Sequence, residues 1–299
     1  MSERSESDVE EVDPVPEEEE EYEEECDDSG LCEEEPNEIS IRDLAWRLFS
    51  DESDIDHPSI LCISPRRSGK SFFCRHLFYW ADNYPKGKFD AVFLYSGSTF
   101  NGDWSNIFPK RYQFYDWTEE NARHLLSILE NQRRLYEEDL EKEKPTGRMP
   151  RVLVLLDDIV SGDRLYAGAR GKALTTCFMR GRHVGVTCCV LLQKWRSFSA
   201  LRSNADVLLM FRECNRLLRK SIIEEHMTCY KTTDIESVRC AERYFERVFK
   251  SKYHALVLDQ AGSRGAKYLR EYTYSCKAPS EPAPDYCLGP AHHWRQTPG

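Results

Sequence analysis

The stretch SILCISPRRSGKSFFCRHLFYWADNY, residues 59–84, decides the fold expected for this chain. Its first part, SILCIS (59–64), is a short apolar run of the kind that forms a buried strand. Its last part, KSFFCRHLFYWADNY (70–84), is typical of a helix. The segment SPRRSGKS (64–71) joins the two, and a Gly-Lys-Ser sequence between a strand and a helix indicates a phosphate-binding loop.

The residue types in this loop suit a nucleoside triphosphate. Gly69 lets backbone N–H groups approach the phosphates, Lys70 reaches the β and γ oxygens, and the hydroxyl of Ser71 ligates Mg²⁺. We therefore expect ATP and Mg²⁺ to bind here. The expected nucleotide-binding residues are Ser64, Pro65, Arg66, Arg67, Ser68, Gly69, Lys70 and Ser71.

The loop departs from the usual pattern at its first position. That pattern begins with Gly, whereas this chain has Ser64 followed by Pro65. The opening turn must therefore be made by residues other than glycine. A partner motif further along the chain is required to support the assignment.

That partner is RVLVLLDD (151–158), an apolar run that ends in two carboxylates. A strand at this place would deliver Asp157 to the Mg²⁺ shell, so that Asp157 and Ser71 are the expected metal ligands. Asp158 would polarise the attacking water as general base. The alternative is a capped strand end, because Asp commonly starts turns.

Two further catalytic candidates follow. The strand-like VGVTCCVLLQ (184–193) ends in Gln193, whose amide is suited to hydrogen-bonding a γ-phosphate or the attacking water. Just before it, MRGRHVG places Arg180 and Arg182 at the rim of the expected sheet, and Arg182 is preferred as an arginine finger that reaches a neighbouring subunit's nucleotide. A solvated basic turn or a DNA contact stays open for these arginines, and the sequence does not separate a cis from a trans role.

Strand-like and helix-like segments alternate around these motifs. Strands are expected at FDAVFLYS (89–96) and ADVLLMFR (205–212), and helices over 119–144 and 167–181. This order predicts an α/β fold, with a mostly parallel central sheet flanked by helices, as in RecA/ASCE-like P-loop NTPases. The remaining expectations are a capped helix after Ser40, helices over 215–228 and 232–250, and a terminal hairpin of YHALVLD (253–259) and KYLREYTYS (267–275).

Charge is divided unevenly along the chain. The formal net charge is −11, but the first forty residues contain 20 Asp or Glu and only Arg4, a balance of −19 that leaves +8 for the rest. We expect a disordered acidic tail over 1–38, an ATPase domain over 39–275 and a C-terminal tail over 276–299. The basic body suits contact with nucleic-acid phosphates, although a solubilising surface explains its charge equally well.

The cysteines and the apolar runs of the sequence indicate the cellular compartment. Cys62, Cys188 and Cys189 lie in apolar strand-like runs, which favours buried reduced thiols over a disulfide framework. The N-terminus has no apolar core of a signal peptide, and eighteen apolar residues never occur together. We therefore expect a soluble intracellular protein with no membrane partner.

Two other groups of residues carry weaker signals. Cys276, Cys287, His292 and His293 could supply four zinc ligands, but their spacing matches no compact zinc finger. Aromatic residues between Tyr95 and Trp117 are of a kind that stacks on bases, yet aromatics that flank a strand are more often core or interface residues. We assign these aromatic residues no role.

Taken in order, the motifs resemble those of a known family. The phosphate loop, the paired aspartates, RGRH before a strand that ends in Gln, and LRSNADVLLMF (201–211) look like the genome-packaging ATPases of poxviruses and related polinton-type viruses. These belong to the FtsK–HerA superfamily of P-loop NTPases. The resemblance covers roughly residues 55 to 215, and the order of the motifs is more diagnostic than any single one.

The resemblance implies an ATP-driven motor that assembles as a homo-oligomeric ring and moves viral double-stranded DNA into a capsid. Its further partners would be capsid or portal-vertex proteins, and it would act inside the infected host cell, in nucleus or cytoplasm, or in the virion. The acidic tail lies outside the family core. The implied roles are nucleotide and metal binding by Lys70 and Ser71, hydrolysis by Asp157 and Asp158, sensing by Gln193, a trans contact by Arg182, and positioning of the loop after the sensor by Arg202 and Asn204.

Two other functions stay open. A P-loop kinase of a small acceptor would use the same loop and carboxylates, but it predicts an Arg-rich lid, and no compact lid stands out. A non-catalytic DNA-binding or scaffold protein with a decayed phosphate loop would explain Ser64. The intact Lys70, Ser71, Asp157 and Asp158 argue against this last reading.

Overall fold

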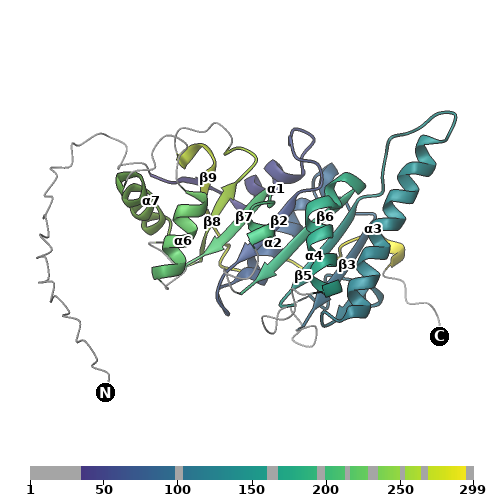
Figure 1. Ribbon diagram of the computed structural model, residues 1–299, viewed down its shortest axis with the longest axis horizontal. Helices are drawn as coiled ribbons and strands as arrows, with labels where there is room; N and C mark the ends of the chain where they lie inside the picture. The colour runs from purple at the N-terminus through teal and green to yellow at the C-terminus, as the bar shows by residue number, and fades with distance from the viewer. Residues whose placement is uncertain are drawn as a thin grey trace, which may run out of the picture.

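The computed structural model describes residues 35–97, 104–159, 168–193, 199–212, 216–227, 235–249, 253–263 and 269–293. Nine strands in this part of the chain form one mixed sheet in the order β1-β9-β8-β7-β2-β6-β5-β3-β4. Figure 1 shows the run of strands from β9 to β3 across the molecule. The strands are β1 (Asn37–Ile39), β2 (Ser59–Ile63), β3 (Ala91–Ser96), β4 (Gln113–Tyr115), β5 (Val152–Asp157), β6 (Val186–Leu192), β7 (Val207–Phe211), β8 (His254–Asp259) and β9 (Thr273–Lys277). The α-helices are α1 (Ile41–Phe49), α2 (Lys70–Ala81), α3 (Glu119–Leu140), α4 (Gly168–Arg180), α5 (Ser199–Arg202), α6 (Arg216–His226) and α7 (Ile235–Val248).

Most of the sheet is parallel. Strands β4, β3, β5, β6, β2 and β7 pair in parallel, whereas β8 pairs antiparallel with both β7 and β9. Every residue of β2, β5, β6 and β7 is buried, as parallel strands covered on both faces require. The α/β fold class expected from the alternating segments is confirmed.

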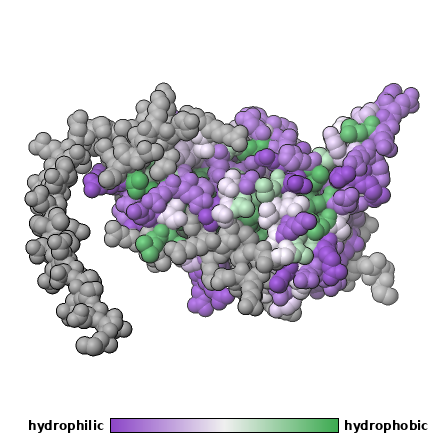
Figure 2. All heavy atoms as spheres, in the orientation of Figure 1, coloured by the Kyte–Doolittle hydropathy of each residue, from purple (hydrophilic) through white to green (hydrophobic). Residues whose placement is uncertain are grey.

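Helices pack on both faces of the sheet and bury two apolar cores. One core joins the sheet to α3, α4, α6 and α7. The other joins it to α1 and α2 and includes Trp104, Phe108 and Leu288. In the space-filling view, hydrophilic residues cover the outer side of α3 and the chain after it, and paler, more apolar residues gather toward the middle of the molecule (Figure 2).

The strand order brings the expected motifs together. Strand β6 lies between β2 and β5, with Leu61 opposite Val190 and Leu155 opposite Cys189. The carboxyl ends of these three strands therefore lie side by side, and open α/β sheets bind ligands just outside such carboxyl ends. The phosphate loop follows β2, Gln193 follows β6 and Asp158 follows β5.

Local signals in the sequence have the expected structural outcome at both ends of the domain. Ser40 caps α1 in a capping box with Asp43, whose backbone N–H donates to the Ser40 hydroxyl at 3.1 Å. Strands β8 and β9 form the expected antiparallel pair. Strands β1 and β4, each three residues long, were not expected.

Ordered structure reaches past the expected domain boundaries of 39 and 275, because β1 begins at Asn37 and β9 ends at Lys277. Beyond β9, residues 278–293 form what we call the C-terminal strap. The strap contacts α2, where Tyr286 Oη donates to Arg75 O at 2.7 Å, and then β3, where Gly289 lies against Val92. Most of the acidic tail, residues 1–34, lies outside the described residues, so its expected disorder stays a prediction.

The cysteines named from the sequence are buried thiols. Cys62, Cys188 and Cys189 are free and fully buried, and burial raises the pKa of each thiol above its ordinary value. Cys240 on α7 differs, because it is disulfide-bonded. None of the helices described combines the length and apolar character that crossing a bilayer requires.

Candidate nucleotide-binding site

The loop between β2 and α2 has the backbone geometry of a phosphate cradle. Gly69, which caps α2, has a φ of 96°, in the left-handed region that favours glycine. An added Cβ at Gly69 would meet no atom within 4 Å, so open space lies beside this residue. The loop thus presents the N-terminus of α2 to that space, where backbone N–H groups bind anions.

The opening turn is built around the ammonium group of Lys70. Lys70 Nζ donates to Ser64 O at 2.9 Å and to Pro65 O at 3.1 Å, and only 9% of the residue is exposed. Ser64 also hydrogen-bonds Ser68 through their hydroxyls, and its N–H donates to Leu192 O at 3.1 Å. Carbonyl groups and a serine pair therefore make the turn for which the usual pattern uses glycine.

Asp157 lies directly against the loop. Ser71 Oγ donates to Asp157 Oδ2 at 3.1 Å, and Trp104 Nε1 donates to the same oxygen at 2.7 Å. Burial raises the pKa of the Asp157 carboxyl, whereas the two hydrogen bonds and the nearby charge of Lys70 act in the opposite direction. The contact between Ser71 and Asp157 joins segments 86 residues apart.

These two side chains fit a Mg²⁺ ion. Mg²⁺ takes oxygen ligands and commonly binds one or two carboxylates together with substrate phosphates. Ser71 and Asp157 offer a hydroxyl and a carboxylate oxygen 3.1 Å apart. Asp157 is only 4% exposed, so a bound cation would offset the desolvation of its charge.

Asp158 and Gln193 form a second contact beside the first. Asp158 has a φ of 51°, a left-handed conformation that Asp tolerates better than most residues. Gln193 Nε2 donates to Asp158 Oδ1, and Gln193 Oε1 accepts from Arg66 Nε at 2.8 Å. The structure thus brings the candidate base, the candidate sensor and a phosphate-loop residue into one chain of hydrogen bonds.

Two residues of this site were missed from the sequence. Trp104 belongs to the aromatic stretch for which the sequence predicts no role. It is a core residue, as are Tyr95 and Trp117 of the same stretch, but its N–H also donates to Asp157. A Cβ at Gly97 would lie 2.7 Å from Asp158 O, so glycine lets the end of β3 approach the end of β5. A buried tryptophan usually finds a partner for its N–H, and this was the one available signal for Trp104.

Arg182 lies at the amino ends of the strands, on the side of the sheet opposite the phosphate loop. It precedes β6, whereas Gln193 follows that strand, and seven strand residues span roughly 20 Å. Its guanidinium is half-exposed and contacts Asp206 at 3.4 Å, beside a polar cavity of about 530 Å³. Arg182 therefore cannot reach the phosphate loop of its own protomer, which removes the cis role and leaves the trans role as a prediction.

Arg202 and Asn204, to which the resemblance also assigns a role, lie near the amino ends of the strands as well. Arg202 Nε donates to the Glu225 carboxylate at 3.0 Å, and Asn204 Nδ2 donates to Ala200 O at 2.8 Å. The loop that they were expected to position, residues 194–198, lies outside the described residues. Their expected role is therefore still a prediction.

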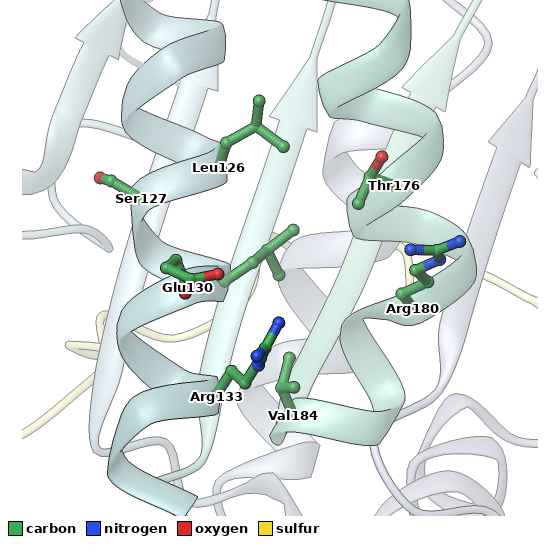
Figure 3. A pocket seen from close by; sticks show the side chains of 8 residues that line it. Leu126, Ser127, Glu130, Arg133, Thr176, Arg180 and Val184 are labelled. Carbon is green, nitrogen blue, oxygen red and sulfur yellow. The ribbon is translucent and has the colours of Figure 1, made fainter. Parts of the chain in front are cut away.

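A second cavity, of about 450 Å³, lies between α3 and α4. Figure 3 shows its lining side chains on the two facing helices, Leu126, Ser127, Glu130 and Arg133 on α3 and Thr176 and Arg180 on α4. Of the candidate site residues weighed from the sequence, this cavity holds Arg180 alone. Arg180 thus contributes to a groove between helices and not to the phosphate loop.

The four candidate zinc ligands are not brought together. Cys276 is buried on β9, near one edge of the sheet, whereas the His293 ring packs 4.9 Å from Tyr112, next to β4 at the other edge. Within the described residues, no group of three or more His, Cys, Asp or Glu side chains is placed to hold a metal ion.

The sheet order, the loop between β2 and α2, and the carboxylates at the end of β5 define a P-loop NTPase fold. No protein-family model matches the chain. The chain is 25% identical over 171 residues to uncharacterized protein L437 of Acanthamoeba polyphaga mimivirus, and the match covers 56% of this chain and 57% of that protein. The chain thus matches little more than half the length of this relative.

Solved structures of ATPases are similar at low sequence identity. EssC (ATPases 2 and 3) of Geobacillus thermodenitrificans is 12% identical, with a TM-score of 0.48, over 74% of this chain and 39% of that one. The genome-packaging NTPase B204 of Sulfolobus turreted icosahedral virus 2, in complex with ATP-γS, is 13% identical, with a TM-score of 0.43, over 74% of this chain and 97% of that one.

Proposed function

We propose that this chain is an ATPase that couples the hydrolysis of Mg²⁺-ATP to the movement of double-stranded DNA. One observation carries the proposal: the hydroxyl of Ser71, at the phosphate loop, lies 3.1 Å from the carboxylate of Asp157, with Asp158 and Gln193 beside them. A phosphate cradle and two carboxylates at the same strand ends suit attack of water on a terminal phosphate.

Each residue has a part in this reaction. Lys70 and the N–H groups at the start of α2 would hold the triphosphate, and Ser71 and Asp157 would hold Mg²⁺, which neutralises charge on the phosphate oxygens when bound. Asp158 would accept a proton from water as the water oxygen bonds the γ-phosphorus. The bond from that phosphorus to the β–γ bridging oxygen then breaks, which gives ADP and phosphate.

The finer function is a viral genome-packaging motor. Under this proposal the ATPase domain works in a homo-oligomeric ring inside the infected host cell, or in the virion, with duplex DNA and capsid or portal-vertex proteins as partners. The order of the motifs supports it, and the similarity to an uncharacterized mimivirus protein supports the viral setting alone. The surplus of +8 charges outside the first forty residues suits a DNA partner.

The test is an ATPase assay of the purified protein with and without linear duplex DNA, run beside a measurement of particle size. We expect phosphate release that DNA accelerates in an oligomeric fraction. Lys70→Ala should lose nucleotide binding, whereas Asp158→Asn should bind ATP and hydrolyse it at least about a hundredfold more slowly, the scale of a lost general base.

The other outcomes separate the remaining functions. DNA-independent transfer of phosphate to a nucleoside would favour a small-acceptor kinase. ATP binding without turnover, in every oligomeric and DNA-bound state, would favour a scaffold. Wild-type hydrolysis by Asp158→Asn would reassign the base.

A further inference from the structure

We propose that Arg66 senses whether the phosphate loop is filled and passes this state to Asp158 through Gln193. The inference rests on the proposed ATPase function and concerns the regulation of the same site. Arg66 acts as a positioning residue, because its effect on Asp158 passes through another side chain.

Two hydrogen bonds make the connection. Arg66 Nε donates to Gln193 Oε1 at 2.8 Å, across 127 residues of sequence, and Gln193 Nε2 donates to Asp158 Oδ1. Arg66 lies in the phosphate loop after β2, Gln193 follows β6 and Asp158 follows β5. The relay thus crosses three adjacent strand ends.

The chemistry of the three groups fixes the direction of the relay. A guanidinium only donates hydrogen bonds, and an ionised carboxylate only accepts them. The amide of Gln193 must therefore turn its oxygen to Arg66 and its NH₂ to Asp158, so its orientation is not ambiguous. An amide offers an acceptor at one end and a donor at the other, which is what a link between a guanidinium and a carboxylate requires.

Arg66 is placed to exchange this partner for a phosphate. It is exposed, and it lies four residues before Lys70, whose ammonium already binds the loop carbonyls. Its acceptor at Gln193 is a neutral amide oxygen, whereas a triphosphate offers anionic oxygens, to which Arg forms stronger hydrogen bonds. Nucleotide in the loop should therefore draw Arg66 away from Gln193.

The consequence falls on Asp158. While Arg66 holds Gln193, the amide N–H occupies Oδ1 of Asp158, one of the two oxygens that would accept a proton from water. The backbone of Asp158 stays in place because Gly97 packs against its carbonyl. Once Arg66 leaves, Asp158 alone holds the Gln193 amide, which can then turn away and free Oδ1. Both side-chain oxygens of Asp158 are therefore available to water when the loop is occupied.

Reciprocity of coupling gives an equilibrium test that does not depend on turnover. In the wild type, ATP must compete with Gln193 for Arg66. Gln193→Ala removes the competitor and should tighten binding of ATP-γS about three- to tenfold, the scale of the net free energy of one ordinary hydrogen bond. In an Arg66→Ala background the same Gln193→Ala change should leave the Kd unchanged.

Arg67 provides the matched control, because Arg67→Ala removes the same charge from the same exposed loop. In that background Gln193→Ala should still tighten ATP-γS binding. Weaker binding by Gln193→Ala, or an equal effect with and without Arg66, would overturn the relay. A wild-type protein that does not bind ATP-γS at all would overturn the proposed function itself, so the two failures are distinguishable.

A structure with ATP-γS and Mg²⁺ gives a second readout that no folding defect affects. We expect the distance from Arg66 Nε to Gln193 Oε1 to exceed hydrogen-bonding range, with the guanidinium on phosphate oxygens. Arg66 still bound to Gln193 beside an occupied loop would contradict the proposal.

Discussion

Asp157 receives hydrogen bonds from Ser71 and Trp104 on the same oxygen, Oδ2. The indole of Trp104 is almost fully buried and packs edge-on against Phe108, with ring centroids 5.9 Å apart. Since packing fixes the ring, its N–H fixes the plane of the carboxylate. Groups that orient a metal ligand in this way tune metal affinity although they do not touch the metal.

Trp104→Phe should therefore weaken the response to Mg²⁺. The phenyl ring keeps most of the packing but gives no N–H to Asp157, so we expect half-maximal hydrolysis to need about tenfold more Mg²⁺. The matched control is Trp117→Phe, because the buried Trp117 N–H has no hydrogen-bond partner among the described residues. A titration of ATPase rate against Mg²⁺ that shifts equally in both variants would show that packing, not the N–H, matters.

For single residues, the sequence predicts the motifs but not the contacts between them. Lys70, Ser71, Asp157 and Gln193 could be named because each lies at the end of a recognisable strand or the start of a helix. The contacts of Trp104 and Arg66 join residues 53 and 127 positions apart, and no local pattern encodes such pairs. They depend on the strand order, which the sequence leaves undefined.

Among the elements, the end of α3 carries a cluster centred on Asp139. Its carboxylate accepts from Lys142 Nζ at 2.8 Å, Thr146 N at 2.9 Å and Gly147 N at 2.7 Å. The hydrogen bond from Lys142, with those from Thr146 and Gly147, lowers the pKa of Asp139 to about 2. The carboxylate therefore ties the chain after α3 back onto the helix.

The sign of the pH effect follows from this lowered pKa. The contribution to stability is fully present above the ordinary Asp pKa, near 4, and is lost as pH falls toward about 2. Asp139→Asn should mimic the acid state at neutral pH and speed amide hydrogen exchange at Thr146 and Gly147 about tenfold. Glu138→Gln, in an exposed pair with Arg134, should leave those amides unchanged; equal exchange in the two variants would contradict the assignment.

Element type was predictable wherever an element is long or wholly apolar. Strands β2, β5 and β6 appear as continuous apolar runs because both of their faces are buried. Strands β1 and β4 were missed because three residues at a sheet edge carry no periodicity, and they form only through pairing with β9 and β3. The sequence predicts a tail over 276–299 because this Pro-rich stretch shows no periodic pattern, and the strap contains no regular element longer than one turn.

At the scale of the whole molecule, the candidate arginine finger lies at the amino ends of the strands and the phosphate loop lies at their carboxyl ends. A surface that offers Arg182 can therefore meet the loop only of another copy, in a head-to-tail contact that closes into a ring when the rotation permits. Each active site would then need residues from two chains.

Mixing experiments test this arrangement. We expect Arg182→Ala and Lys70→Ala proteins, each inactive alone, to recover ATPase activity when mixed, because an interface between them holds one intact phosphate loop and one Arg182. Arg180→Ala, which changes a residue in the α3–α4 groove, should stay active alone and need no such complementation. Mixtures of Arg182→Ala and Lys70→Ala that stay inactive would remove the trans role.

The strap also contributes to global stability. Leu288 is fully buried in the core beneath α2, whereas the adjacent Cys287 is exposed. Leu288→Ala should lower the free energy of unfolding by about 2–5 kcal/mol, and Cys287→Ala by less than about 0.5 kcal/mol. Urea unfolding of the two variants measures the difference, and similar midpoints would mean that the strap is only loosely attached.

Because the strap crosses from β9 to β3, Asn37 and His293 lie near opposite edges of the nine-stranded sheet. A mechanical load applied between these two residues would act across the strands, along the direction of their inter-strand hydrogen bonds. The inter-strand hydrogen bonds would then break one after another, whereas a load along the strands would be shared by all of them at once. Single-molecule pulling from these points should therefore give rupture at low force, beginning with the short ladder between β1 and β9.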